Sequence, residues 1–382
     1  MRNALLMSAV LTCAAAIAIG ASTGSGAPPG QLLEGKRLFE QATFGGNGRT
    51  CETCHSLATG TVSPADAEKR FAQDPNDPLF VHDGSDDGQG HGTSRMRRDA
   101  TVLMTIRMAD NIQLADDPSA KTVVIPRGIP TTLNTPALDE VLMVDGRQPT
   151  LEQQATGAIQ DHAQGAVPPI AALQAIAAFQ KTNAFFSSPE IRRFALEKGA
   201  DPVLPQGVTE SEIRGRRFFD DLPPDPTDGL KPGLCAHCHS GPLLNQTNEF
   251  AKMFIPSPAP IPAGQRFISV GISELHPAGS REFIFNPGKS DEFHLVSPDP
   301  GRALITGVIP ANDPTLEHVN AFKISPLRGI SRTAPYFHDN SAKTLEDVAA
   351  HYTLFFQIVS AGFINLTAQD QADIVAYMKL LN

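Results

Sequence analysis

Two short cysteine motifs carry the clearest chemistry in this chain of 382 residues. The first reads CETCH at residues 51–55 and the second reads CAHCH at residues 235–239, so both have the form C-x-x-C-H. Two thiols three positions apart on a helical turn can each add to a vinyl group of haem, and the imidazole of the following histidine then lies under the iron. The motifs predict two covalently bound c-type haems, held by Cys51, Cys54 and His55 and by Cys235, Cys238 and His239.

Zinc binding, disulfide formation and redox-dithiol chemistry are the alternatives for cysteines that come in two pairs. None of these alternatives explains why a histidine follows each pair directly. The fifth cysteine, Cys13, lies in an apolar N-terminal segment and belongs to neither motif. His237, inside the second motif, is expected to be a solvated spacer.

The N-terminus has the composition of an export signal. Arg2 supplies a positive charge, residues 4–19 form a short apolar run, and small residues follow, with candidate cleavage sites after Ala21 and Ala27. The apolar run is too short for a membrane-spanning helix. Residues 1–27 are therefore predicted to be a signal peptide, and the mature protein is predicted to be periplasmic without a membrane span.

The overall charge limits the class of partner. The formal net charge at neutral pH is −10. An acidic surface disfavours nucleic acid and anionic lipid, and it suits a basic protein partner through long-range attraction. We therefore expect a protein partner and no nucleic acid.

A weak internal repeat places each motif after a short amphipathic helix. The segment LLEGKRLFEQ precedes the first motif, and SEIRGRRFFDD precedes the second behind a capping box of Thr209 and Glu212. A helix followed by a C-x-x-C-H loop is how class I cytochrome c domains begin. We therefore predict a mainly α fold of two such domains, residues 28–204 and 205–382, with long irregular loops and one covalent haem in each.

Three further helices are expected from apolar periodicity and capping signals. One runs from Thr150 to about Gln164, and one of its faces carries Leu151, Ala155, Ile159 and His162. The other two open with capping boxes, Thr344 with Asp347 and Thr367 with Asp370. Strand signals are few and short, such as RFISVGI.

The segment TAPYFH at residues 333–338 adds a family resemblance. It lies within SPLRGISRTAPYFHDNSAKTLEDV, which is similar to the second-domain signature of the bacterial dihaem cytochrome c peroxidase and MauG superfamily, and NTPALDEVLMVDGRQPTLEQQA is similar to the first-domain signature. The resemblance covers most of residues 31–382, although residues 56–132 are longer than the family's usual form. It implies that the first haem reacts with hydrogen peroxide, that the second relays electrons or stores oxidising equivalents, and that a calcium ion lies between the domains.

For the second haem, the resemblance implies a distal ligand fourteen residues after the histidine of the Pro-Tyr-Phe-His block, and this count from His338 gives Tyr352. The family's peroxidases have Met at this place, and its MauG-type enzymes have Tyr. Tyr352 falls on the apolar face of its predicted helix, which fits a ligand and also fits an ordinary core tyrosine. A tyrosinate is a hard anionic donor that lowers the haem potential relative to a thioether. The resemblance places His338 near this haem as a hydrogen-bonding group, whereas His351 is expected to be solvated.

For the first haem, the resemblance implies a labile distal histidine in a Gly-His-Gly loop, and His91 lies in such a sequence, further from His55 than in the family. The alternative is a surface loop, which would leave the first haem open. The family's distal acid–base glutamate aligns with Gln164, whose amide cannot shuttle protons. His162 could take that role, with Gln154 and Gln164 positioning peroxide, and a satisfied core histidine is the alternative for His162.

The resemblance also concerns a tryptophan position between the haems and the calcium ligands. Val144 stands where the family has a tryptophan between the haems, and the chain contains no tryptophan, so electrons would tunnel directly or use a group such as Tyr336. The resemblance implies calcium ligands from the side chain of Asn134 and the backbone carbonyls of Thr333 and Pro335. Oxygen ligands of this kind suit calcium.

Three functions stay open at this point. The first is a periplasmic peroxidase that reduces hydrogen peroxide with electrons from a small cytochrome c or cupredoxin. The second is a MauG-like oxidase that uses peroxide to modify a side chain of a protein substrate, and the third is a non-enzymatic dihaem electron carrier. The family as a whole favours the first, Tyr352 favours the second and Gln164 favours the third, and a homodimer is left open.

Overall fold

The computed structural model describes residues 26–197, 199–253 and 255–382. The predicted signal peptide lies outside the described residues, apart from its last two positions. Helices predominate in the described residues, as the sequence predicts. They are α1 (Pro29–Gln41), α2 (Cys51–Cys54), α3 (Pro64–Gln73), α4 (Ser94–Asp99), α5 (Thr135–Leu138), α6 (Leu151–Gly157), α7 (Ile170–Phe179), α8 (Pro189–Glu197), α9 (Glu210–Arg216), α10 (Ile272–Leu275), α11 (Ala303–Thr306), α12 (Leu345–Val359) and α13 (Ala368–Met378).

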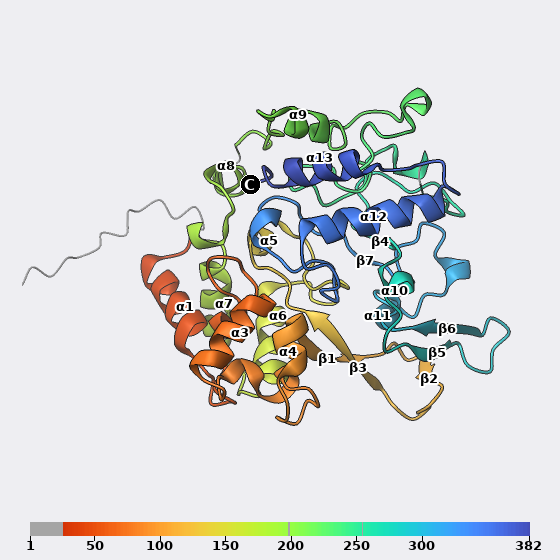
Figure 1. Ribbon diagram of the computed structural model, residues 1–382. Coiled ribbons are helices and arrows are strands. Elements are labelled where there is room, and N and C mark those ends of the chain that lie inside the picture. Colours follow the sequence, from red (N-terminus) through yellow and green to blue (C-terminus); the bar gives the residue numbers. More distant parts are fainter. Residues whose placement is uncertain (1–25, 198, 254) are drawn as a thin grey trace, which may run out of the picture.

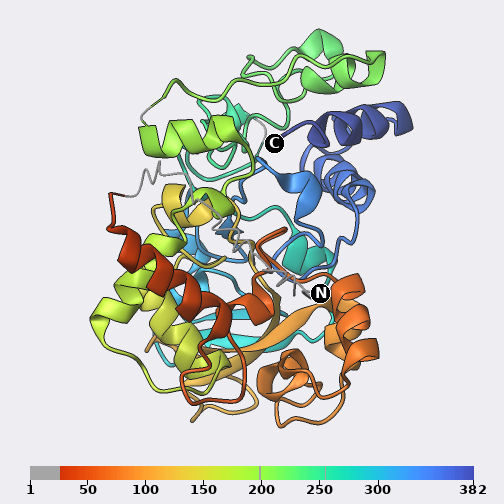
Figure 2. The ribbon, with the colours of Figure 1, turned by 90° about the vertical axis from the view of Figure 1, so that its left-hand side faces the viewer.

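The helices gather at two ends of the molecule. Figure 1 and Figure 2 show α1, α6 and α7 at one end and α9, α12 and α13 at the other. Each end contains one of the two C-x-x-C-H motifs, because α1 leads into the first motif and α9 into the second. The arrangement follows the internal repeat seen in the sequence.

The predicted helix starts are confirmed. In each of the three predicted capping boxes, both reciprocal hydrogen bonds are present: Thr209 with Glu212, Thr344 with Asp347 and Thr367 with Asp370. The helix expected from Thr150 to about Gln164 is α6 followed by a π-helical turn, η3 (Ala158–His162). Such turns often occur at functional sites.

The β-structure is more extensive than the sequence interpretation expected. The strands are β1 (Thr101–Arg107), β2 (Ile112–Leu114), β3 (Thr122–Gly128), β4 (Phe267–Ile268), β5 (Arg281–Phe285), β6 (Phe293–Ser297) and β7 (Phe322–Lys323). They form the antiparallel pair β1–β3, the sheet β2–β5–β6 and the pair β4–β7. The expectation of few, short strands was wrong for β1 and β3. Burial alternates along these two strands, and the sequences TVLMTIR and TVVIPRG show a matching period-2 pattern of residue types.

The repeated glycine before each motif has a packing reason. A Cβ atom added at Gly35 would lie 2.0 Å from the carbonyl oxygen of Ala175, and one added at Gly215 would lie 2.0 Å from the carbonyl oxygen of Asp373. Helix α1 therefore crosses α7 at close range, and α9 crosses α13 in the same way. The match between GKRLF and GRRFF thus reflects the same helix crossing at both ends of the molecule.

Replacing Gly35 with Ala is expected to lower the free energy of unfolding by roughly 1–3 kcal/mol, because the new methyl group forces two backbones apart. Denaturant unfolding followed by circular dichroism measures this change. Gly30 provides a matched control in the same helix, since a Cβ atom there meets nothing within 4 Å. Gly30→Ala should leave stability unchanged or raise it, and equal losses in the two variants would contradict the close crossing.

Three larger hydrophobic cores hold the fold together. One lies between residues 38 and 185 and one between residues 218 and 381. The third combines residues 62–129 with residues 283–309, so it draws on both sides of the predicted domain boundary. Strand β2 pairs with β5 across the same boundary. The two ends are therefore joined by a shared core and sheet, and the boundary near residue 204 stays a prediction.

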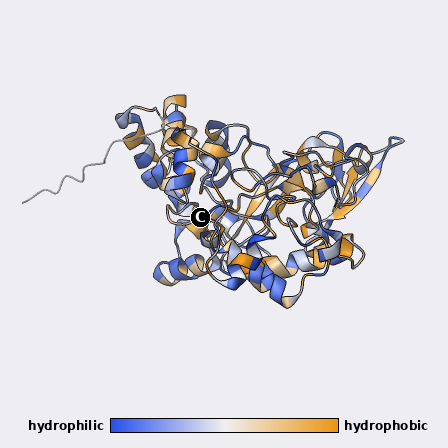
Figure 3. Ribbon diagram, turned by 90° about the horizontal axis from the view of Figure 1, so that it is seen from above, coloured by the Kyte–Doolittle hydropathy of each residue, from blue (hydrophilic) through white to orange (hydrophobic). Residues whose placement is uncertain are grey.

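The helices carry both hydrophobic and hydrophilic residues (Figure 3). Within the described ranges, no helix combines the length and the apolar character needed to cross a bilayer.

Candidate functional site

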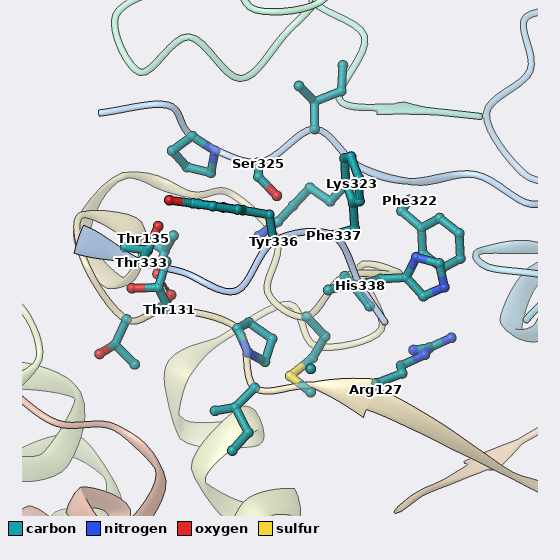
Figure 4. Close-up of a pocket in the computed structure, with 18 of the residues that line it drawn as sticks. Arg127, Thr131, Thr135, Phe322, Lys323, Ser325, Thr333, Tyr336, Phe337 and His338 are labelled. Carbon is teal, nitrogen blue, oxygen red and sulfur yellow. Dashed lines mark hydrogen bonds between the residues drawn. The ribbon is translucent and has the colours of Figure 1, made fainter. Parts of the chain in front are cut away.

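One cavity of about 360 Å³ connects the two cysteine motifs. Its lining includes both cysteines and the histidine of each motif, and also residues from α6, α12 and the loop after β7. Figure 4 shows a pocket with Tyr336, Thr333 and His338 around it. The tertiary structure thus brings two motifs that are far apart in the sequence onto a common space.

The histidines of the two motifs have hydrogen bonds that would suit metal ligation. Nδ1 of His55 lies 2.8 Å from the carbonyl oxygen of Gly60, and Nδ1 of His239 lies 2.9 Å from that of Leu244. A hydrogen bond from Nδ1 to a carbonyl fixes the tautomer, leaves Nε2 bare and raises its basicity as a ligand. Both histidines line the cavity, and within the described residues neither Nε2 has a hydrogen-bond partner.

The four cysteines also fit covalent haem. None of the cysteines in the described part of the chain forms a disulfide. Burial raises the pKa of all four thiols, to about 12 for Cys51 and for Cys238. A reactive redox dithiol needs a lowered pKa, so the structure argues against that alternative. Thr50 caps α2 and fixes the turn that presents Cys51 and Cys54 to the cavity.

Tyr352 faces the same cavity beside the second motif. It projects from α12, and burial together with the nearby Cys238 and Cys235 raises the pKa of its phenol. No hydrogen bond in the described residues involves its hydroxyl group. A buried phenol of this kind ionises only beside a strong positive charge, such as a haem iron. The position fits the ligand role implied by the resemblance, and that role stays a prediction.

Two histidines expected to be solvated are buried, and those expectations were wrong. His351 is 8% exposed, its Nε2 lies 3.0 Å from the carbonyl oxygen of Val270, and its ring stacks on His276. His237 is 1% exposed and packs edge-on against Phe250, and burial lowers its pKa to about 4. Helix geometry turns His351 away from Tyr352, but a loop covers that face.

The candidate distal group, His162, ends the π-helical turn and lines the cavity. Its Nδ1 lies 2.5 Å from a carboxylate oxygen of Asp83. Asp83 is 4% exposed and makes a second, very short ion pair with Arg49, which is 2% exposed. Within the described residues the Nε2 of His162 has no hydrogen-bond partner. Burial lowers the pKa of His55 against the opposing hydrogen bond to Gly60, His162 lowers it further, and both histidines line the same cavity.

The two glutamines near His162 occupy different places. Gln154, on α6, lines the cavity. Gln164 follows the end of the helix with φ of 53°, is exposed, and accepts a hydrogen bond of 3.3 Å from Asn47. It is not part of the cavity lining. The backbone turn at Gln164 directs its side chain away from the cavity. Of the three candidates, only Gln154 and His162 line the cavity.

His91 lies away from both motifs. Its side chain is 83% exposed, and its Nδ1 lies 2.7 Å from Asp87 in the same loop. The cavity lining does not include it. The structure places this Gly-His-Gly sequence in an exposed loop, which corresponds to the alternative considered from the sequence.

A buried charge network lies between the two ends of the molecule. Arg127, on β3, makes ion pairs with Asp145 at 2.5 Å and with Asp299 at 2.7 Å, and all three side chains are at most 2% exposed. Burial opposes the charge of Asp145, but Arg127 and then Arg147 outweigh it and hold the pKa of Asp145 below its usual value. The paired charges satisfy the condition for burying ionic groups.

His338 lies at the edge of this network. Its Nε2 is 3.7 Å from Asp299, and its ring stacks on Phe322 with ring centroids 3.5 Å apart (Figure 4). Its Nδ1 is buried, with no hydrogen-bond partner in the described residues. His338 lines the cavity, as does Val144 at the place of the family's tryptophan.

The three candidate calcium ligands lie in two different environments. Asn134 is fully buried; its side-chain oxygen accepts a hydrogen bond of 2.8 Å from the backbone of Ser187, and its amide donates to the carbonyl of Arg328 at 2.9 Å. Thr333 and Pro335 line the cavity. No group of three or more His, Cys, Asp or Glu side chains in the described residues is arranged to hold a metal ion. The calcium site stays a prediction.

Sequence reasoning missed Asp83, Arg49, Arg127 and Asp299. The partner pairs are far apart in sequence: 79 positions separate Asp83 from His162, and 172 separate Arg127 from Asp299. No local spacing rule connects such residues.

The fold and the site together define a class: a mainly α protein in which two C-x-x-C-H motifs share one cavity. Residues 31–191 match the family model described as di-haem cytochrome c peroxidase. Over that range the chain is similar to this family, in agreement with the resemblance recognised in the sequence. A di-haem peroxidase of that family contains two haem cofactors and is an oxidoreductase.

A solved structure of another protein supports the fold. A MauG-like protein associated with microbial copper homeostasis aligns with a TM-score of 0.52 and 17% sequence identity, covering 94% of this chain and 91% of that chain. The diheme peroxidase BthA from Burkholderia thailandensis aligns with a TM-score of 0.45 and 16% identity, covering 93% of this chain and 86% of that chain. The search of curated proteins found no match.

Proposed function

We propose that this protein is an exported, periplasmic dihaem c-type peroxidase that reduces hydrogen peroxide with electrons from a small redox protein. One molecule of hydrogen peroxide takes up two electrons and two protons and gives two molecules of water. His55 and His239 are the proposed proximal ligands, the four motif cysteines are the covalent attachment points, and a calcium ion near Asn134 is part of the proposal.

The observation that carries the proposal is the placement of His162. His162 lines the cavity that His55 also lines, its Nδ1 is bonded to Asp83, and its Nε2 has no hydrogen-bond partner in the described residues. When bound, the haems supply the redox chemistry of the reaction. His162 accepts a proton from one oxygen of the peroxide and returns it to the other, which leaves as water. Gln154 lines the same cavity and can donate a hydrogen bond to the peroxide.

A MauG-like oxidase is the second candidate, and Tyr352 favours it. A tyrosinate ligand stabilises oxidised iron, which suits a site that stores oxidising equivalents more than one that accepts electrons from a high-potential donor. In this case the two electrons would come from a side chain of a partner protein.

A peroxide titration of the loaded protein, followed by optical spectroscopy, tests the proposal. Protein mass should first show two covalently attached haems. Steady consumption of peroxide with a reduced small cytochrome c supports the peroxidase. A lasting oxidised state without such turnover supports the MauG-like oxidase, and no reaction with peroxide would leave a dihaem electron carrier.

A further inference from the structure

The side chain of His162 is fixed from several directions by residues that the sequence did not single out. Its Nδ1 is bonded to Asp83 at 2.5 Å. Its backbone carbonyl accepts hydrogen bonds from Asn47 at 2.9 Å and from Arg49 at 3.1 Å. Neighbouring segments therefore determine where η3 ends and how the imidazole of His162 is rotated.

Asp83 is itself held rigidly. One of its carboxylate oxygens pairs with Arg49, the other with His162, and its backbone carbonyl accepts a hydrogen bond of 2.7 Å from Arg95. Burial opposes ionisation of the carboxyl, but the hydrogen bond from His162 and the charge of Arg49 hold its pKa below the usual value. Asp83 thus remains a carboxylate and accepts the Nδ1 proton of His162.

Arg49 is held by several hydrogen bonds besides its ion pair with Asp83. Its guanidinium group also donates to the backbone carbonyls of Pro78 at 2.8 Å, Leu79 at 3.0 Å and Val81 at 2.7 Å. These residues come from the same segment as Asp83, just before it. The guanidinium group therefore ties this segment to the loop that leads into the first C-x-x-C-H motif.

We propose that Asp83, held by Arg49, is the positioning residue for His162 and keeps its Nε2 bare toward the first haem site, an inference that rests on the proposed function. A carboxylate on Nδ1 fixes the tautomer and stabilises the imidazolium that forms when Nε2 takes a proton. The segment 56–132, which is longer than in the family, supplies this carboxylate. The Asp83–His162 pair takes over the acid–base role at a site where Gln164 stands in place of the family's glutamate.

The test uses the association of cyanide with the ferric first haem of the purified, haem-loaded protein. Hydrogen cyanide must lose its proton to bind as the anion, and His162 Nε2 receives that proton. Asp83→Asn is expected to slow cyanide association by roughly 10–100-fold, which is part of the 10²–10⁴-fold that a general acid–base group usually contributes. Asp83→Glu, which keeps a carboxylate, should recover part of the rate.

A double-mutant cycle with His162→Gln separates positioning from general support of the fold. If Asp83 acts through His162, adding Asp83→Asn to His162→Gln causes no further loss. A further loss equal to that of the single variant would overturn the proposal, as would a wild-type rate in Asp83→Asn. Asp86→Asn is the matched control, since Asp86 follows Asp83 closely in the chain and its carboxylate accepts hydrogen bonds from the backbone of Ser94 and Arg95 instead of from His162.

The outcome is distinguishable from that of the proposed function. Wild-type protein that does not react with peroxide, but shows the expected cyanide cycle, would remove the enzyme assignment and leave the positioning role intact. If wild-type protein reacts with peroxide but Asp83→Asn binds cyanide at the wild-type rate, the enzyme assignment stands and the positioning role of Asp83 is overturned.

Discussion

Replacing His162 with Gln is expected to slow the reaction with hydrogen peroxide by a factor of about 10²–10⁴, the usual contribution of a general acid–base group. The amide of Gln can donate and accept hydrogen bonds but cannot carry a proton between the two peroxide oxygens. His162 lines the cavity that contains His55. Stopped-flow spectroscopy of the loaded protein, mixed with peroxide, measures the rate.

A histidine remote from the cavity provides the control. His294, on β6, is half exposed and pairs with Glu282 and Glu292. His294→Gln should react at the wild-type rate. If Gln164→Ala caused a larger loss than His162→Gln, the distal group would be Gln164 and not His162.

Replacing Tyr352 with Phe is expected to change the optical and EPR spectra of the second haem and to raise its reduction potential by on the order of 0.1 V, since axial ligands set haem potentials over a wide range. The phenol oxygen would be lost while the aromatic ring that packs on Phe356 remains. Potentiometric titration and EPR spectroscopy measure the two effects. Haem content should be unchanged, because the attachment residues are untouched.

The chain offers a matched tyrosine for comparison. Tyr377 is fully buried on α13, its hydroxyl group donates to the carbonyl of Pro205 at 2.8 Å, and the cavity lining does not include it. Tyr377→Phe should leave both haem spectra as in the wild type. Unchanged spectra in Tyr352→Phe would make Tyr352 an ordinary core residue.

Local patterns predicted the helices well because the physical causes of helix starts are local. A capping box needs only residues three positions apart, and each of the three predicted boxes is formed. The β1–β3 hairpin was missed although its alternating pattern was present. The burial of His351 and His237 could not be read from the sequence, since it depends on loops that arrive from elsewhere.

The sequence by itself determined the two C-x-x-C-H motifs, which are the predicted attachment points, and it placed each motif after a helix whose glycine permits a close crossing. Tertiary structure alone decided that both motifs open onto one cavity, that His162 faces it and that Gln164 does not. It also supplied Asp83 as the partner of His162. The physical reason is distance along the chain: a buried carboxylate and an imidazole 79 positions apart meet only after the intervening segments have packed.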